Sequence, residues 1–139
     1  LETLKRLELP VKIFVLNNKG YGSIRITQKA YFEGRFAGSS TGSGLTLPDF
    51  CRVADAHGIR TFRIANNPEL KENIRQILDY NGPVLCELLI NPDQVTAPRM
   101  MSYKTEDGRM ISRPLEDLWP FLDRDEFRQN MIIKPLEDK

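Results

Sequence analysis

Two asparagines and two glycines follow the first strongly apolar segment of the chain. The segment 11–16 (Val-Lys-Ile-Phe-Val-Leu) runs directly into the polar turn 17–23 (Asn-Asn-Lys-Gly-Tyr-Gly-Ser). The Asn18 side chain offers a neutral oxygen to a hard cation, and Gly20 lets a backbone carbonyl approach one closely. Backbone N–H groups that open the next helix are suited to phosphate. The turn therefore predicts a site that holds a metal ion and an anionic cofactor together.

The same residues have a second interpretation, as simple turn chemistry after a strand. Composition alone leaves both interpretations open. A second asparagine pair, Asn66-Asn67, provides a comparison, because it precedes Pro68 and is explained by helix capping. No such explanation applies to Asn17 and Asn18.

Other reactive residue types give weaker signals. The segment 38–44 (GSSTGSG) lacks the Gly-Lys-Ser/Thr ending of a nucleotide P-loop, so we expect a flexible loop that can close over a ligand. His57 is the only histidine, so a zinc site finds no support and we expect a structural role. Cys51 and Cys86 lie in apolar segments and predict buried thiols in a reducing compartment, the cytoplasm. The segment 33–35 (Glu-Gly-Arg) either shapes a pocket or forms a solvated charge pair.

Helical and strand patterns alternate through the first two thirds of the chain. In order, the spacing predicts helix 1–7, strand 11–16, a helix from about 22, helix 47–57, strand 60–64, a helix from Asn67-Pro68-Glu69 to about 80, and strand 84–90. This order implies an α/β fold, a three-layer parallel sheet with flanking helices. Strand 84–90 is nearly all apolar and is expected at the centre of the sheet. Glu87 interrupts it and is expected at the sheet rim or paired with a cation.

The character of the chain changes after Pro92. Residues 94–114 show little periodicity, and short helical turns are expected at 115–119 and 124–127. We therefore divide the chain into a domain over 1–93 and an irregular C-terminal extension over 94–139. We expect the extension to pack on the domain surface or on a neighbouring subunit.

Composition excludes several classes of protein. The chain has 139 residues, of which 40% are hydrophobic and 28% charged, and its net charge is +1. The balanced charge argues against a nucleic-acid partner, and the scattered basic residues form no membrane-surface patch. No apolar run approaches the roughly 20 residues that a membrane span needs.

The first residues already have helical spacing, with Leu1, Leu4 and Leu7 on one side, yet no capping residue precedes them. We expect the chain to be part of a longer polypeptide, and a sheet of only three strands indicates the same. A frayed native terminus is the alternative.

Residues 9–22 resemble the closing half of the thiamine diphosphate motif, which runs from Gly-Asp-Gly to Asn-Asn over about thirty residues. Further matches are Tyr31-Phe32-Glu33-Gly34-Arg35, Leu47-Pro48-Asp49-Phe50, Ala54-x-Ala56-x-Gly58 and Gly82-Pro83-Val84-Leu85-Cys86-Glu87. This set, in this order, resembles the C-terminal domain of acetolactate-synthase-like enzymes over about residues 1–95. The chain contains no Gly-Asp-Gly, so the opening half of the motif is missing.

The resemblance implies a specific set of ligands. Magnesium would bridge the cofactor diphosphate to the protein through the Asn18 side chain and the Gly20 carbonyl, consistent with its preference for oxygen donors. Tyr21, Gly22 and Ser23 would open the helix that faces the diphosphate. A further aspartate, and a glutamate from a separate domain, would have to come from outside these residues.

The function implied is part of a thiamine diphosphate- and Mg2+-dependent carboligase or decarboxylase. Such an enzyme decarboxylates a small, pyruvate-like 2-oxo acid and transfers the carbanion to an acceptor. The resemblance also implies a homo-oligomer, a dimer or tetramer, and the isolated chain is expected to be inactive. Two alternatives stay open: a non-catalytic remnant or regulatory module, and an unrelated phosphosugar or nucleotide binder. Arg99 and Tyr103 are further candidates for the substrate region.

Overall fold

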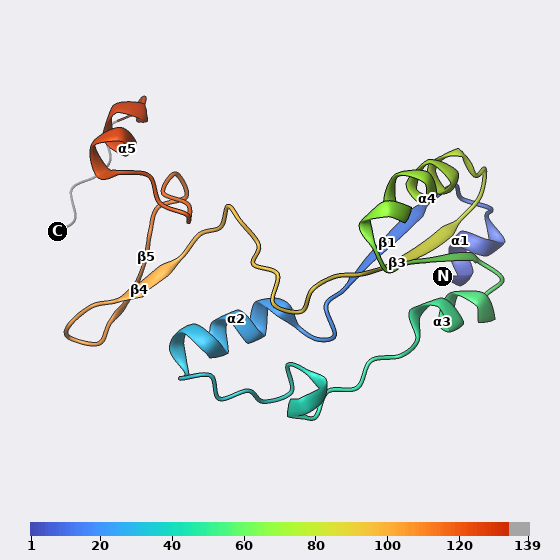
Figure 1. Cartoon of the computed structure of the whole chain (residues 1–139), viewed down its shortest axis with the longest axis horizontal. Helices are drawn as coiled ribbons and strands as arrows, with labels where there is room; N and C mark the ends of the chain where they lie inside the picture. Colours follow the sequence, from blue (N-terminus) through green and yellow to red (C-terminus); the bar gives the residue numbers. More distant parts are fainter. Residues whose placement is uncertain (134–139) are drawn as a thin grey trace. The chain divides into compact units, whose positions relative to one another are not determined.

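The chain folds into two compact units, Leu1–Gln94 and Val95–Lys139. They are seen in a computed structural model that describes residues 1–133 (Figure 1). Each unit has a sheet of its own, three-stranded in the first and two-stranded in the second. Within residues 1–133, no helix is both long enough and apolar enough for a membrane crossing.

The first unit alternates helices and strands. Its elements are α1 (Glu2–Arg6), β1 (Lys12–Asn17), α2 (Gly22–Tyr31), the 3-10 turn η1 (Thr41–Ser43), α3 (Phe50–Ala56), β2 (Arg60–Ile64), α4 (Asn67–Asp79) and β3 (Val84–Leu89). The predicted order of helices and strands is confirmed. The strand boundaries differ from the predicted ones by at most one residue, because strand alternation and the flanking turn residues are local properties.

The sheet is parallel, with the strand order β1-β3-β2. Cys86 of β3 lies between Phe14 of β1 and Phe62 of β2 in the register. The prediction that the apolar segment 84–90 forms the central strand is therefore confirmed. Because the strands are parallel, their carboxyl ends meet at one edge, which is where α/β folds place their ligands.

Helices cover both faces of this sheet. Val84 and Cys86 of β3 pack with Ile77 of α4 in one buried cluster, whereas Leu85 packs with Ala54 of α3 in another. Successive strand residues point to opposite faces, so these two clusters lie on the two sides of the sheet, between α4 and α3 (Figure 1). This is the predicted three-layer α/β class.

One predicted helix start and one predicted N-cap are wrong. The helix expected at Leu47 begins only at Phe50, because Asp49 is the N-cap and its carboxylate accepts the N–H of Arg52 at 3.1 Å. The helix expected to be capped by Asn67 is capped one residue earlier, where Asn66 accepts the N–H of Glu69. In both cases the side chain that reaches the free N–H group decides the boundary.

Helix α2 begins where predicted but has no buried residue. Its apolar side chains, Ile24 and Tyr31, and the following Phe32 are exposed. Within the described residues, the apolar face that the sequence predicts is therefore only partly covered.

The second unit is more regular than predicted. It contains the antiparallel hairpin β4 (Ser102–Lys104) and β5 (Met110–Ser112), followed by α5 (Arg124–Asn130). The segment predicted as irregular therefore holds two strands, which are too short for alternation to be recognised. At the predicted helical turn 115–119, the N–H of Asp117 donates to the Pro114 carbonyl and closes a single turn, but no helix forms. The second helical prediction, at 124–127, is confirmed and extended by three residues to Asn130.

Candidate functional site

The turn after β1 stands at the carboxyl edge of the sheet. Asn17 is the last residue of β1 and lies opposite Leu89 of β3. Lys19 has a φ of 58°, in the left-handed region, and Gly20 forms an isolated antiparallel bridge with Ser40. The segment 38–44 therefore lies beside the turn, although it is distant in sequence.

The two asparagines have different surroundings. Asn17 Nδ2 donates to Glu87 Oε1 at 2.6 Å, and Asn17 Oδ1 accepts the N–H of Lys19 at 2.9 Å. Asn18 is half-buried, and its backbone carbonyl accepts Arg25 Nη1 at 3.4 Å. Among the described residues, no hydrogen bond reaches the Asn18 side-chain amide. Asn17 is thus held by its neighbours, whereas the amide oxygen of Asn18 is available to a ligand.

Close packing explains both glycines of the turn. A Cβ atom on Gly20 would overlap the carbonyl oxygen of Ser39, and one on Gly22 would overlap the side-chain amide of Asn18. The Gly20 carbonyl oxygen accepts no hydrogen bond from the described residues. Two neutral oxygens in one short turn, from Asn18 and Gly20, therefore have no partner in the part of the chain that the structure describes. They are the donor type that Mg2+ prefers, so the residues present fit such an ion.

The start of α2 offers N–H groups to an anion. No side chain caps this ten-residue helix, and the N–H groups of Gly22 and Ser23 meet no acceptor within the described residues. The N–H of Tyr21 is already used, because it donates to the Ser39 carbonyl at 2.9 Å. Of the three predicted cofactor residues, Gly22 and Ser23 thus have free main-chain donors for a phosphate.

The segment 38–44, which the sequence predicts as a flexible loop, contains the 3-10 turn η1 and several internal hydrogen bonds. Ser39 is fully buried, and its hydroxyl donates to Gln28 Oε1 at 2.7 Å. The Ser43 hydroxyl accepts the N–H groups of Ser39 and Ser40 at 3.0 and 2.9 Å. These contacts fix the segment against the Gly20–Tyr21 backbone.

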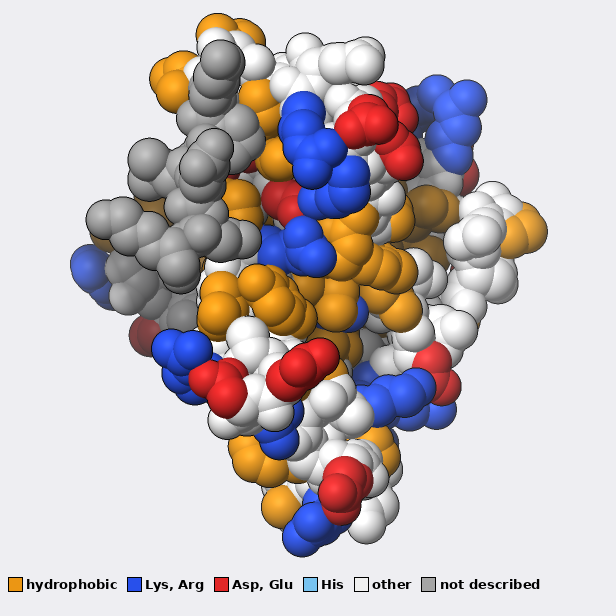
Figure 2. All heavy atoms as spheres, turned by 90° about the vertical axis from the view of Figure 1, so that its left-hand side faces the viewer, with side chains coloured by type: hydrophobic (Ala, Val, Ile, Leu, Met, Phe, Trp, Pro, Cys, Tyr) orange, Lys and Arg blue, Asp and Glu red, His pale blue; other side chains and the backbone are white. Residues whose placement is uncertain are grey.

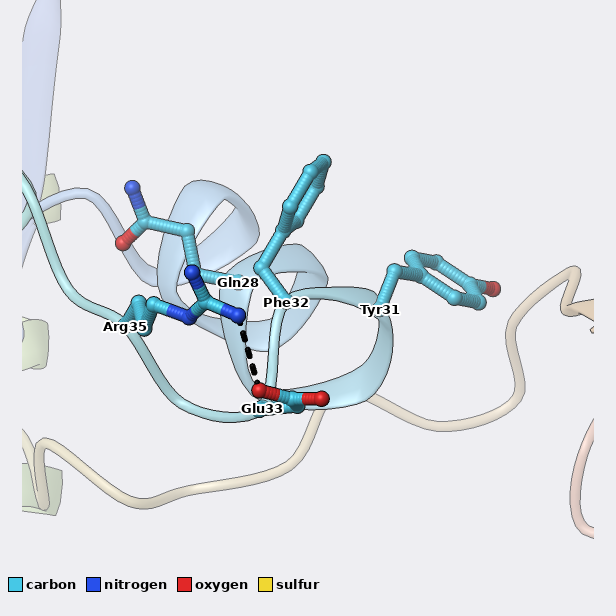
Figure 3. Close-up of a pocket in the computed structure, with 5 residues that line it drawn as sticks. All are labelled: Gln28, Tyr31, Phe32, Glu33 and Arg35. Carbon is cyan, nitrogen blue, oxygen red and sulfur yellow. Dashed lines mark hydrogen bonds and ion pairs between the residues drawn. The ribbon is translucent and has the colours of Figure 1, made fainter.

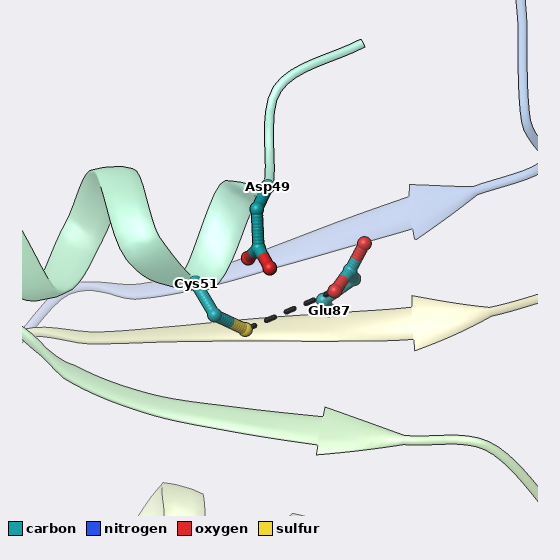
Figure 4. Close-up of side chains that lie close together, drawn as sticks. All are labelled: Asp49, Cys51 and Glu87. Atoms are coloured by element: carbon teal, nitrogen blue, oxygen red, sulfur yellow. Dashed lines mark hydrogen bonds between the residues drawn. The ribbon is translucent and has the colours of Figure 1, made fainter.

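A charged cluster lies beneath the N-terminus of α3, on the sheet face that α3 covers. The ligand atoms of Asp49, Cys51 and Glu87 all lie within 4.8 Å of one another, and Figure 4 shows Asp49 and Cys51 directed toward Glu87. Arg63 Nε lies 2.6 Å from Glu87 Oε2, and Arg63 Nη2 lies 2.9 Å from Asp49 Oδ1. The Arg63 guanidinium therefore pairs with both carboxylates, and these residues form an ion-pair network. Of the two predictions for Glu87, pairing with a cation is confirmed and a place at the rim is wrong.

The ionisation of the cluster follows from these contacts. The N–H of Arg52 and the guanidinium of Arg63 hold the pKa of Asp49 below its ordinary value. Hydrogen bonds to Glu87 and Asp49 raise the pKa of Arg63 further above its already high value. Burial raises the pKa of the Cys51 thiol, which is therefore a weak donor and not a reactive thiolate. Both cysteines are free, and Cys86 is fully buried as predicted, whereas Cys51 is only half-buried.

A shallow pocket of about 330 Å³ lies at the C-terminal end of α2. Its lining residues are Gln28, Tyr31, Phe32, Glu33 and Arg35 (Figure 3). Glu33 and Arg35 form a 2.8 Å ion pair across it, and both side chains are about 80% exposed. The two interpretations of this segment are thus both correct: the pair is solvated, and it lines a pocket. The pocket contains none of the residues 18–23.

The remaining candidates lie elsewhere. His57 is the C-cap residue of α3, and its Nδ1 lies 3.1 Å from Glu2 Oε2. Arg99 and Tyr103 both belong to the second unit, where Arg99 stacks on Trp119 and Tyr103 lies under Arg113.

Comparison with known proteins gives a consistent result. A family model described as "Thiamine pyrophosphate enzyme, C-terminal TPP binding domain" matches residues 1–88. The acetolactate synthase large subunit of Cyanidium caldarium is 32% identical over 105 residues, which cover 76% of this chain and 18% of that protein. The corresponding subunit of Pyropia yezoensis is 32% identical over 111 residues, covering 80% of this chain and 18% of that protein. The mitochondrial acetolactate synthase of Schizosaccharomyces pombe is 32% identical over 90 residues, covering 65% of this chain and 13% of that protein. The chain thus spans less than a fifth of the length of these relatives.

Proposed function

Because the chain belongs to the thiamine pyrophosphate enzyme family and carries its C-terminal cofactor-binding domain, we propose that it is part of a thiamine diphosphate- and Mg2+-dependent, acetolactate synthase-like enzyme. The observation that carries the proposal is the unpaired oxygen pair of Asn18 and Gly20 beside the uncapped start of α2. Family membership removes the alternative of an unrelated phosphosugar or nucleotide binder.

The chain's own residues would bind and orient the cofactor. Asn18 and Gly20 would supply two oxygen ligands to Mg2+, and the N–H groups of Gly22 and Ser23 would hold the diphosphate. When bound, thiamine diphosphate supplies the electron sink that loss of carbon dioxide from a 2-oxo acid requires. The proposed reaction is decarboxylation of a pyruvate-like acid with transfer to an acceptor; the relatives carry the name acetolactate synthase.

The proposed site is incomplete within these residues. The sequence has no Gly-Asp-Gly, which would supply the remaining carboxylate ligand. We therefore propose that the chain alone forms no acetolactate from pyruvate, even with the cofactor and Mg2+ added. Acetolactate formation by the purified chain would contradict this part of the proposal.

The metal assignment is tested by Asn18→Ala in a polypeptide that contains the complete motif. The affinity for thiamine diphosphate at limiting Mg2+ should fall by at least about tenfold, because one oxygen ligand is lost. Asn81→Ala is the matched control, since Asn81 is an exposed turn asparagine. Unchanged affinity and metal dependence in Asn18→Ala would refute the assignment. Failure of the unaltered polypeptide to bind the cofactor would favour a non-catalytic module.

Assembly and location belong to the same proposal. The exposed apolar side chains include Leu16 on β1 and Phe32 after α2, which suit contact with another subunit in a dimer or tetramer. Light scattering after gel filtration measures this directly. The free thiols Cys51 and Cys86 suit the reducing cytoplasm, whereas several relatives are named mitochondrial enzymes. Cell fractionation distinguishes the two compartments.

A further inference from the structure

We propose that Glu87 is a positioning residue that sets the orientation of the Asn17 amide and thereby the shape of the turn that carries Asn18 and Gly20. The link to Mg2+ rests on the proposed function. The hydrogen-bond arrangement from Glu87 to Lys19 can be tested without it.

Glu87 is buried in an unusual place for a carboxylate. It lies on the central strand β3, and its side chain is only 4% exposed. Each carboxylate oxygen has its own donor: Oε1 accepts Asn17 Nδ2 at 2.6 Å, and Oε2 accepts Arg63 Nε at 2.6 Å. Cys51 Sγ is a weak additional donor to Oε2 at 3.8 Å. The buried carboxylate is therefore satisfied, as its position requires.

The carboxylate decides which way the Asn17 amide faces. An ionised carboxylate only accepts hydrogen bonds, so Asn17 must direct its NH2 group toward Glu87. Its oxygen then faces the turn and accepts the N–H of Lys19 at 2.9 Å. This bond bridges Asn18 and supports the left-handed backbone of Lys19, which a non-glycine residue adopts only at a cost.

The other side of Glu87 is fixed as well. Arg63 lies opposite Glu87 in the register of β2 and β3, so both side chains project to the same face. Arg63 Nη2 also donates to Asp49, whose carboxylate caps α3. Arg63 thus holds one carboxylate oxygen of Glu87 and is itself held by Asp49. The other oxygen of Glu87 is directed at Asn17.

Two exchanges between amide and carboxylate test this arrangement. In Glu87→Gln, the new amide has one acceptor, which Arg63 takes, and its NH2 group then faces the NH2 group of Asn17. Asn17 must rotate its amide, so Lys19 loses its acceptor. In Asn17→Asp, the new carboxylate faces the Glu87 carboxylate and is repelled by it.

The double variant Asn17→Asp/Glu87→Gln reverses the direction of the hydrogen bond between the two positions. The NH2 group of the introduced glutamine donates to the introduced carboxylate, and its oxygen still accepts from Arg63. The other oxygen of that carboxylate accepts the N–H of Lys19, as the Asn17 oxygen does in the unaltered chain. The total charge is unchanged, so the double variant should restore the turn.

The first measurement is hydrogen exchange of the Lys19 amide in the purified chain, followed by NMR. Each single variant should exchange about tenfold faster than the unaltered chain, because Lys19 loses its acceptor in Glu87→Gln and repulsion by Glu87 displaces the introduced carboxylate in Asn17→Asp. The double variant should return to within about threefold of the unaltered rate, because its hydrogen bonds are restored. Glu72→Gln is the matched control, since Glu72 is an exposed glutamate on α4.

Two outcomes would overturn the inference. One is an unchanged exchange rate of the Lys19 amide in Glu87→Gln, and the other is a double variant in which this amide exchanges as fast as in Glu87→Gln. If Glu87→Gln does not fold, the exchange rate of the Lys19 amide in Asn17→Asp is decisive. An unchanged rate would mean that any acceptor at position 17 is sufficient and that residue 87 does not orient it. The inference would then be refuted.

The second measurement is the Mg2+ dependence of thiamine diphosphate binding in a polypeptide with the complete motif. The Mg2+ concentration at half-saturation should rise about tenfold in Glu87→Gln and recover in the double variant, whereas the affinity at saturating Mg2+ changes less. If the unaltered polypeptide does not bind the cofactor, the proposed function fails and the exchange data still decide the role of Glu87. If it binds and Glu87→Gln keeps the same Mg2+ dependence, the positioning role in metal binding is refuted.

Discussion

Among residues 1–133, each of the two units contains one buried carboxylate held by arginine, but the surroundings of the two carboxylates differ. Glu87 belongs to the unit Leu1–Gln94, which also contains two clusters of fully or nearly fully buried apolar side chains. Asp117, in the second unit, is 3% exposed and pairs with Arg113 and Arg124 at 2.8 Å each. In the described part of that unit, no hydrophobic residue is buried to the same degree.

Arginines take the place of an apolar core in the second unit. Arg113 lies over Tyr103 and Phe121, and Arg124 lies over Phe121 and Phe127. Figure 2 shows basic, acidic and hydrophobic side chains interspersed on one face of the molecule. The comparison indicates that the first unit owes its stability mainly to apolar burial, with Glu87 arranging a turn, whereas Asp117 itself holds the second unit together.

The largest expected effect is in the apolar core of the first unit. Ile77→Ala removes a fully buried side chain and should lower the free energy of unfolding of that unit by about 2–5 kcal/mol. Far-UV circular dichroism in urea follows the loss, because most helix and sheet belongs to this unit. Fluorescence of Trp119, the only tryptophan, reports on the second unit and should not change.

Leu78→Ala is the control for this prediction, since the neighbouring Leu78 is 59% exposed and its loss should cost less than about 0.5 kcal/mol. A shift of the Trp119 transition equal to that of the dichroism would show that the units unfold together, and the contrast between them would fail.

An intermediate effect is expected for Asp117→Asn. The change keeps the shape of the side chain but removes the charge that two arginines share, and it should lower the free energy of unfolding of the second unit by about 1–3 kcal/mol. The Trp119 fluorescence transition in urea measures it. Asp125→Asn provides the control, because the Asp125–Arg128 pair is exposed. Equal shifts in the two variants would mean that burial of Asp117 contributes nothing.

The smallest effect is a pH dependence confined to the second unit. Hydrogen bonds from Arg124, with a smaller contribution from Arg113, hold the pKa of Asp117 below its ordinary value. A carboxyl group with a lowered pKa in the folded state adds stability at neutral pH, and this is lost as the pH falls below about 4. The urea midpoint of the Trp119 transition should therefore fall between about pH 5 and pH 2.

The slope of this pH dependence should be smaller in Asp117→Asn, although not zero. The pKa values of Asp107 and Asp123 in the same unit are also lowered, by local hydrogen bonds. An identical slope in Asp117→Asn and the unaltered chain would assign the whole effect to these exposed groups.

Most of the first unit was predictable from sequence. The segment 84–90 is apolar except for Glu87, which is typical of a strand covered on both faces, and the Asn-Pro-Glu pattern marks the start of α4 to within a residue. The predicted start of α3 is three residues too early. Either Leu47 or Asp49 could stand at the start of the helix, and only the hydrogen bond from the N–H of Arg52 to Asp49 decides between them. The hairpin β4–β5 was missed because three-residue strands carry too little periodicity.

The candidate site, too, was predictable from the sequence only in part. Local spacing alone singled out the turn with Asn18 and Gly20, because a strand end followed by amides and glycines is recognisable wherever it occurs. The resemblance in residues 1–95 then indicated a cofactor, and the family match over 1–88 agrees with it. The ion-pair network at the N-terminus of α3 had no comparable signal beyond the charge of Glu87 in an apolar strand.

The sequence by itself determined which segments form strands and helices and where a ligand turn lies, because periodicity, caps and turn residues act over a few neighbouring positions. Only the tertiary structure decided that Asn17 and Asn18 differ. Asn17 is bound by Glu87, which is 70 residues away in the chain. That contact exists because β3 lies between β1 and β2, and strand order and register depend on the packing of the whole sheet.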